Sequence, residues 1–259
     1  MELSEAQFRR YARHLILEEV GEAGQERLLA ARVLVVGAGG LGSPLLLYLA
    51  AAGVGTLGVV DDDRVDLTNL QRQIAHATGR VGMLKVESAR TAIAEVNPDI
   101  RVEAHAAKLD VENAADLVGA YDLVADGSDN FATRYCLTDA CFRAGKPLVA
   151  AALAPFDGQI STFRPYLGEG HPCYRCLFRE PPPPDLVPRC ETAGILGAVA
   201  GVIGTLQAVE VLKEILGIGD SLDGTLVMYE ALRAEFHRIR VPKDPQCPTC
   251  GSGGFPGLG

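Results

Sequence analysis

The stretch RVLVVGAGGLGSP, residues 32–44, decides the fold. Its β-branched and leucine side chains predict a buried strand at 32–36, and the apolar segment 41–52 predicts a helix. Between them Gly37, Gly39 and Gly42 fit the spacing G-x-G-x-x-G. Such a turn lets a phosphate approach the backbone N–H groups at a helix N-terminus. We predict a nucleotide site there, while a close-packed turn without a ligand remains the alternative.

Strand and helix patterns alternate through the next hundred residues. We expect a helix at 4–17 with Ser4 as its N-cap, strands at 56–61, 100–106, 121–126 and 147–152, and helices at 81–96 and 131–144. This alternation predicts a parallel sheet covered on both faces. Beyond residue 157, the segments GQISTFRP and GTLVMYEA…EFHRIRV predict antiparallel strands. The expected fold class is α/β: a Rossmann-like, doubly wound, mostly parallel sheet that continues into antiparallel strands.

We divide the chain into an N-terminal helical arm (1–30), a nucleotide-binding half (31–156), an antiparallel half (157–250) and a disordered tail (251–259). The third part contains a crossover loop, EPPPPDLVPRC, in which five prolines exclude regular structure. An apolar run at 193–206 is too short to span a membrane. It predicts a buried helix, with glycines that allow close approach of its own sheet or of a second subunit.

Composition and charge exclude several classes of protein. The 259 residues are 48% hydrophobic, and the formal net charge is −9. A nucleic-acid-binding protein would normally show a basic stripe, which is missing. The start, MELSEAQFRR, has no signal-peptide pattern. We expect a cytoplasmic protein that binds neither nucleic acid nor membrane.

Charged side chains follow the predicted strands at their carboxyl ends. Asp61 is placed to accept ribose hydroxyls, which with the glycine turn would suggest an NAD(P)-dependent oxidoreductase. Arg72 in TNLQRQ, Lys85 and Asp129 in DGSDN favour a nucleoside triphosphate that is cleaved. Cleavage needs cations for the developing charge and a carboxylate for Mg²⁺. Each side chain alone would equally suit a solvated surface.

Four of the seven cysteines form two Cys-x-x-Cys pairs. Cys173 and Cys176 lie in PCYRC, and Cys247 and Cys250 lie about 70 residues later in CPTC. The set suits a structural zinc ion with four thiolate ligands, which would hold the end of the chain against its second half. Two redox dithiols are the alternative.

A fifth cysteine, Cys190, stands alone in PRCETAG beside Arg189. A neighbouring cation in an exposed loop favours a reactive thiolate. An incidental thiol would look the same.

The order of the motifs RYARHLIL, GAGGLGSP, VDLTNLQRQ, GMLKVESA, GSDNFATRY, GQISTF, PCYRCLF and CPTC resembles the MoeB/ThiF family. These proteins are bacterial relatives of ubiquitin-activating E1 enzymes. The resemblance runs from Arg10 to Cys250. It implies that Mg-ATP is used to adenylate the C-terminal Gly-Gly carboxylate of a small ubiquitin-like sulfur carrier. A separate sulfur donor then converts the acyl-adenylate to a thiocarboxylate, for thiamine, molybdopterin or tRNA thiolation. A scaffold that binds the carrier without catalysis is a further hypothesis.

The resemblance also implies roles for single residues. Gly40 and its turn would contact the nucleotide, Asp61 the ribose, and Asp129 Mg²⁺. The remaining cofactor-binding positions implied are Asn69, Gln71, Arg72, Lys85 and Asn130, of which Asn69, Arg72 and Lys85 would hold the phosphates. Arg13 matches an arginine that reaches into the partner subunit's ATP site, which implies an obligate homodimer; otherwise it would be an exposed helical arginine. Cys190 matches a cysteine that bonds covalently to the carrier in thiamine-pathway members.

Overall fold

The computed structural model describes residues 3–181 and 194–252. Within them one sheet has eight strands in the order β3-β2-β1-β4-β5-β6-β7-β8. The strands are β1 (Arg32–Val36), β2 (Thr56–Val60), β3 (Arg101–His105), β4 (Leu123–Asp126), β5 (Leu148–Leu153), β6 (Asp157–Phe163), β7 (Thr225–Glu230) and β8 (Glu235–Arg240). The strands from β3 to β5 in this order pair in parallel, and those from β5 to β8 pair antiparallel. The predicted fold class is confirmed.

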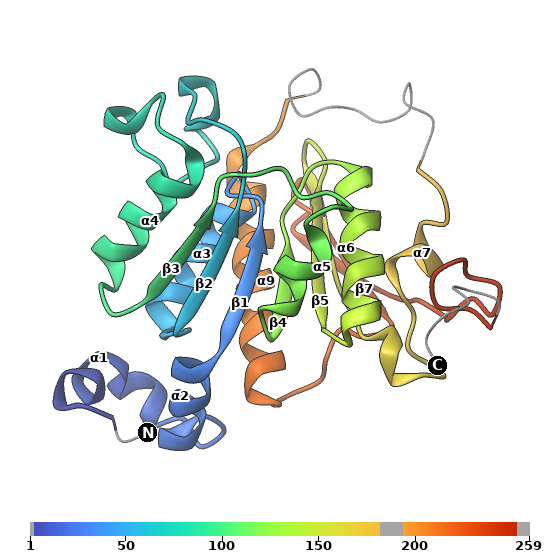
Figure 1. Cartoon of the computed structure of the whole chain (residues 1–259), viewed down its shortest axis with the longest axis horizontal. Helices are drawn as coiled ribbons and strands as arrows, with labels where there is room; N and C mark the ends of the chain where they lie inside the picture. The colour runs from blue at the N-terminus through green and yellow to red at the C-terminus, as the bar shows by residue number, and fades with distance from the viewer. Residues whose placement is uncertain (1–2, 182–193, 253–259) are drawn as a thin grey trace.

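Helices cover both faces of the sheet, as Figure 1 shows. They are α1 (Glu5–Leu15), α2 (Gly21–Ala30), α3 (Gly42–Ala52), α4 (Lys85–Val96), α5 (Ala114–Gly119), α6 (Phe131–Ala144), α7 (Tyr174–Leu177) and α9 (Gly197–Leu216). Val33 and Val35 of β1 pack in the core beneath α3, α4 and α9. The alternate residues Leu34 and Val36 pack in the core beneath α5, α6 and α7. One strand therefore supplies two cores because its side chains alternate between faces.

The helices differ from expectation at the start of α4 and in the N-terminal arm. Helix α4 begins at Lys85 instead of residue 81, because a 3-10 turn at Thr78–Arg80 and a left-handed Gly82 (φ 87°) come first. In the N-terminal arm, the predicted helix is followed by a second one, α2. Ser4 caps α1 as predicted, through a capping box with Gln7.

The long helix α9 packs within its own chain. A Cβ atom added to Gly204 would lie 2.5 Å from the carbonyl oxygen of Leu41, so glycine allows this close approach to the start of α3. The expected buried helix is confirmed, although it begins at Gly197. Among the described helices, none is both long and apolar enough to cross a membrane.

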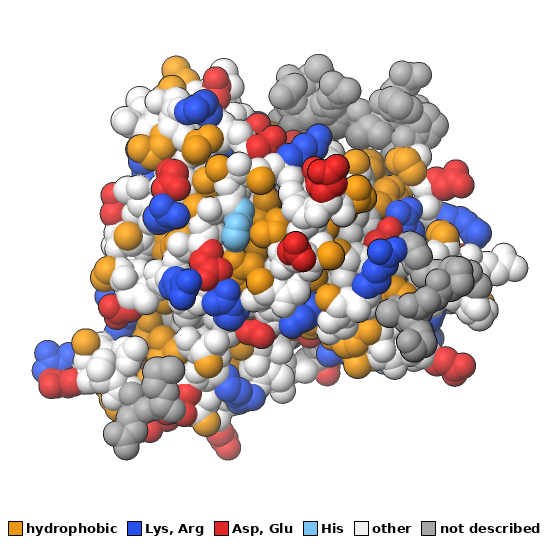
Figure 2. All heavy atoms as spheres, in the orientation of Figure 1, with side chains coloured by type: hydrophobic (Ala, Val, Ile, Leu, Met, Phe, Trp, Pro, Cys, Tyr) orange, Lys and Arg blue, Asp and Glu red, His pale blue; other side chains and the backbone are white. Residues whose placement is uncertain are grey.

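The predicted boundary at 156/157 falls between β5 and β6, where pairing changes from parallel to antiparallel. Both predicted halves therefore contribute to one continuous sheet. Residues 182–193 and 253–259, which include most of the predicted crossover loop and most of the predicted tail, lie outside the described residues. On the face shown in Figure 2, basic and acidic side chains are interspersed, so neither sign of charge forms a continuous patch there.

Candidate functional site

The glycine turn sits where three parallel strands end. The Gly37 amide donates to the Val60 carbonyl at 2.8 Å, and the Gly127 amide donates to the Val36 carbonyl at 2.9 Å. Gly37 has φ 93°, and a Cβ atom on it would lie 2.9 Å from the Gly127 oxygen. A Cβ atom on Gly42 would lie 1.9 Å from the Gly37 oxygen. Glycines 37 and 42 are thus required by packing alone, whatever binds to the turn.

Asp61 fastens this turn to the end of β2. Its Oδ2 atom accepts from the Ala38 amide at 2.8 Å, and its Oδ1 atom accepts from the Asp63 amide at 2.9 Å. Burial raises the pKa of the Asp61 carboxyl, while the Lys85 charge and the two amide hydrogen bonds oppose that shift. The predicted ribose-binding carboxylate therefore lies beside the glycine turn.

Lys85 is the first residue of α4, and its side chain is only 5% exposed. Its Nζ atom lies 2.7 Å from Oδ2 of Asp63. Its backbone amide donates to the carbonyl of the same aspartate at 2.9 Å. The structure thus places a buried cation next to the loop that follows β2.

Arg72 and Asn69 form a pair beside the turn. Arg72 donates through Nη2 to the Asn69 Oδ1 atom at 2.7 Å. The Cγ atom of Arg72 would lie 3.7 Å from a Cβ atom built on Gly40, which is half-buried. Gln71 is exposed, and a Cβ atom built on Gly197 of α9 would lie 2.1 Å from its carbonyl oxygen.

Asp129 and Asn130 follow β4 at the same edge of the sheet. Asp129 is exposed at the entrance to α6. The Asn130 Oδ1 atom accepts from the Thr133 amide at 2.9 Å and so caps α6. The side-chain oxygen of Asn130 is thus used in the helix cap. A contact between Asn130 and the nucleotide stays a prediction.

Sequence reasoning missed a buried histidine behind the turn. His76 is 6% exposed, with Nε2 lying 2.8 Å from the Ala38 carbonyl oxygen and Nδ1 lying 2.9 Å from Ser88 Oγ on α4. It stands three residues after the TNLQRQ motif. A single histidine in a polar loop has no periodic or spacing signal, so the sequence offered only that proximity.

Arg13 lies far from the turn of its own chain. It is exposed on α1, which with α2 lies at the amino ends of the strands (Figure 1). The neighbouring Tyr11 hydroxyl accepts from Asn97 at 2.9 Å, just beyond the end of α4. Helices α3 and α4 begin at the glycine-turn edge, so their far ends mark the opposite edge. Cys190, a further residue that the sequence singles out, lies outside the described residues.

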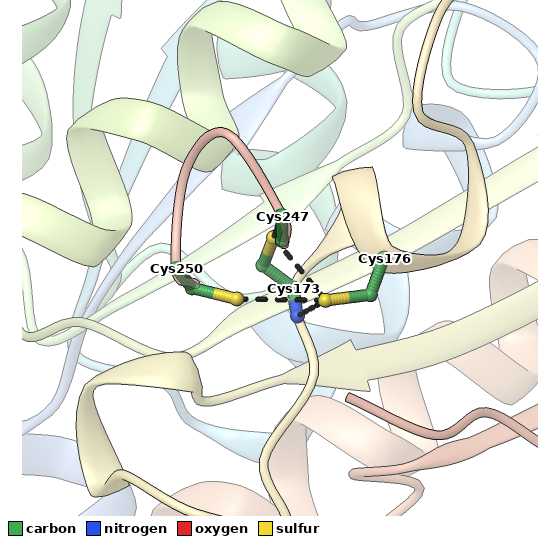
Figure 3. Close-up of side chains that lie close together, drawn as sticks. All are labelled: Cys173, Cys176, Cys247 and Cys250. Carbon is green, nitrogen blue, oxygen red and sulfur yellow. Dashed lines mark hydrogen bonds between the residues drawn. The ribbon is translucent and has the colours of Figure 1, made fainter. Parts of the chain in front are cut away.

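The two Cys-x-x-Cys pairs meet in space. Cys173 and Cys176 at α7 face Cys247 and Cys250, and all four sulfur atoms lie within 4.8 Å of one another (Figure 3). The sulfur–sulfur distance is 3.4 Å for Cys173 and Cys247, 3.5 Å for Cys176 and Cys250, and 3.9 Å for Cys173 and Cys176. A tetrahedron of sulfurs about 2.3 Å from a zinc ion has edges of roughly 3.8 Å. The cluster is therefore close to the size of a Cys₄ zinc site.

Hydrogen bonds favour the thiolate form at one cysteine of this cluster, Cys176, whereas hydrogen bonding to the Cys176 and Cys250 sulfurs, together with burial, raises the pKa of Cys173. The backbone amides of Cys173 and Asp244 each lie 3.4 Å from the Cys176 Sγ atom. The pKa of Cys176 is lowered mainly by hydrogen bonding with the Cys173 side chain. Hydrogen bonds with the Cys250 side chain and with these two amides lower it further. Thiolate is the form that binds metal. Nearby, Thr249 donates to Asp139 of α6 at 2.7 Å, which ties the end of the chain to that helix.

A protein-family comparison matches the ThiF family over residues 11–249. The chain belongs to the ThiF family. It is 52% identical over 244 residues to the sulfur carrier protein adenylyltransferase of Thermus thermophilus, covering 93% of this chain and 90% of that relative. It is 49% identical over 254 residues to the SAMP-activating enzyme E1 of Haloferax volcanii, covering 98% of this chain and 93% of that one.

Among solved structures, E. coli MccB matches with a TM-score of 0.82 at 23% identity, over 97% of this chain and 76% of that one. This likeness supports the fold. The predicted class of enzyme, an E1-like adenylyltransferase, is confirmed by the family and the relatives. The NAD(P)-dependent oxidoreductase alternative finds no support among them.

Proposed function

We propose that this protein uses Mg-ATP to adenylate the C-terminal Gly-Gly carboxylate of a small ubiquitin-like sulfur carrier. The observation behind the proposal is the meeting of Asp61, Lys85 and the glycine turn at one edge of the sheet, in a ThiF-family chain. The names of relatives sharing about half of the sequence support the choice of carrier as substrate.

The nucleotide is proposed to bind along the carboxyl edge of the strands. Asp61 accepts hydrogen bonds from the ribose, and the amides of the turn around Gly40 approach the phosphates. Asn69, Arg72 and Lys85 neutralise the charge that develops as pyrophosphate leaves. Gln71 and Asn130 border the same site. Asp129 is an exposed carboxylate of the kind that binds Mg²⁺, and the ion would supply further neutralisation of phosphate charge.

The chemistry needs little beyond alignment and charge neutralisation. The Gly-Gly terminus is an anion at neutral pH, so it attacks the α-phosphorus without a general base. The bond from this carboxylate to phosphorus forms as the bond from phosphorus to the pyrophosphate oxygen breaks. A separate sulfur donor then displaces AMP to give the thiocarboxylate, in thiamine, molybdopterin or tRNA-thiolation chemistry.

A homodimer would explain the position of Arg13. Its exposure at the opposite edge from its own glycine turn suits a side chain that acts in the site of a second subunit. Each subunit would supply its Arg13 to the site of the other, which gives two shared sites in the dimer.

We further propose that the four clustered cysteines bind a structural zinc ion, since their spacing suits four thiolate ligands. The site joins α7 to the segment around Cys247 and leaves no open position for catalysis. Cys190 is assigned to sulfur transfer and not to adenylation.

The proposal is tested by ATP–pyrophosphate exchange with a panel of small carriers ending in Gly-Gly. Each carrier is also assayed with the two glycines removed, as the matched control. Exchange that requires the tail supports the proposal, and the carrier that works identifies the pathway. No exchange with any carrier, together with tight NAD binding, would overturn it.

A further inference from the structure

His76 uses both of its ring nitrogens inside the protein. A carbonyl oxygen can only accept, so the Nε2 atom carries the proton that is donated to Ala38, at 2.8 Å. In the neutral ring Nδ1 then accepts from the Ser88 hydroxyl, at 2.9 Å. Burial lowers the pKa of His76, as do the charges of Lys85 and Arg80, against the hydrogen bond to Ala38. The ring is therefore neutral at neutral pH.

These contacts fix Ala38, the second residue of the glycine turn. The Ala38 amide donates to Asp61 at 2.8 Å, while its carbonyl accepts from His76. In a trans peptide the C=O and the following N–H point in opposite directions. Because the Ala38 carbonyl points inward to His76, the Gly39 amide points away from the ring. Within the described residues, the Gly39 amide has no acceptor.

The same ring connects the turn to the helix that begins at Lys85. Ser88 is one helical turn beyond Lys85 on α4 and is fully buried. One side chain, His76, thus contacts both the glycine turn and the helix that begins with Lys85.

We propose that His76 is a positioning residue for Mg-ATP, which holds the Ala38 carbonyl inward so that the Gly39 amide faces the phosphates. This inference rests on the proposed function, because it assumes that the turn binds ATP. His76 itself touches no substrate. Its effect is on the orientation of the amide and on the spacing between the turn and α4.

The test uses two substitutions, each of which keeps one of the two hydrogen bonds that the His76 ring makes. The His76→Gln side chain is long enough to donate to Ala38, whereas the His76→Asn side chain reaches only the Ser88 end. Mg-ATP is titrated calorimetrically into the full chain without a carrier, so that no turnover occurs. We expect His76→Asn to weaken binding by about tenfold, as for the loss of one buried hydrogen bond. We expect His76→Gln to stay within about threefold of the wild type.

A matched control removes another buried hydrogen bond from a side chain to a backbone carbonyl, at the end of α3 far from the glycine turn. Gln25 is buried and donates to the Ala52 carbonyl at 2.9 Å. Gln25→Leu should lower the Tm but leave the Kd for Mg-ATP unchanged. Equal affinities for His76→Asn and His76→Gln, or a Tm loss in His76→Asn without weaker binding, would overturn the positioning role and leave the proposed function standing.

A measurement on the wild type keeps the proposal testable if a variant fails to fold. Mg-ATP should slow hydrogen exchange at the Gly39 amide, because that amide gains an acceptor. Binding of Mg-ATP without this protection would overturn the inference alone. A wild type that does not bind Mg-ATP at all would overturn both the inference and the proposed function.

Discussion

The buried ammonium of Lys85 lies 2.7 Å from a carboxylate oxygen of Asp63, whose own side chain is 67% exposed. An unpaired buried charge is costly, so this contact stabilises the cation in the absence of a nucleotide. Because Asp63 stands in solvent, an incoming triphosphate can replace it as partner without leaving that carboxylate buried and unpaired. Asp63 therefore pairs with the Lys85 ammonium until a nucleotide binds, and a phosphate can then take its place.

The first prediction concerns this pair. Lys85→Met keeps the buried apolar stem and removes the charge, and it should lower the rate of ATP–pyrophosphate exchange by about 100-fold or more. Asp63→Asn removes only the exposed partner and should retain most of the activity. Both are measured at saturating carrier. A Lys85→Met enzyme within twofold of the wild type would contradict a role for this cation.

Asp129→Ala should abolish exchange while leaving the fold intact. The side chain is exposed, so its loss removes a proposed Mg²⁺ ligand without opening a cavity. Circular dichroism and thermal unfolding report the fold. Asp116→Ala, at an exposed acidic position on α5, is the control and should be fully active. Near-normal turnover of Asp129→Ala would remove this residue from the metal-binding role.

Mixed dimers test whether sites are shared between subunits. Subunits with Arg13→Ala and subunits with Asp129→Ala should each be inactive alone. Combined, they should recover about a quarter to a half of the wild-type exchange, since one site in a heterodimer has both residues. Heterodimers are verified with two different affinity tags. If proven heterodimers show no recovery, Arg13 acts within its own chain or has no part in catalysis.

Zinc should be found at about one equivalent per chain by elemental analysis. Cys176→Ser should lose the metal and lower the Tm, because the ion joins α7 to the segment that includes Cys247 and Cys250. Cys136→Ser on α6 is the control, since this cysteine lies outside the cluster and should keep the metal. A fully active preparation free of metal would refute the Cys₄ zinc site.

The glycines of the turn should differ in what they tolerate. Gly42→Ala places a Cβ atom 1.9 Å from the Gly37 oxygen and should lower the free energy of unfolding by about 1–3 kcal/mol. In Gly39→Ala the nearest contact is 3.5 Å, to the Gln73 side chain, so the fold should survive. Urea unfolding compares the two. Equal destabilisation by both substitutions would show that the close approach at Gly42 is relieved elsewhere.

Much of the fold could be predicted because its signals are local and periodic. The strand at 32–36 and the turn after it were placed correctly, and so was the change from parallel to antiparallel pairing beyond β5. The start of α4 was placed four residues early, since the apolar Val81 and Met83 continue its pattern although Gly82 breaks the helix. The second helix of the N-terminal arm has only weak amphipathic character and gave no clear pattern.

The sequence by itself determined that the residues at the ends of β1, β2 and β4 gather at the candidate site. Carboxyl ends of parallel strands share one edge of a sheet, so Gly37, Asp61 and Asp129 had to lie near one another once the strands were recognised. Only the tertiary structure decided the partners of the buried groups: Lys85 with Asp63, and His76 with Ala38 and Ser88. These contacts join irregular loops to helices, and the packing of such segments depends on the whole core and on no repeat in the chain. The Cys-x-x-Cys spacing identifies the two pairs in the sequence. Only the tertiary structure shows that all four sulfur atoms lie within 4.8 Å of one another.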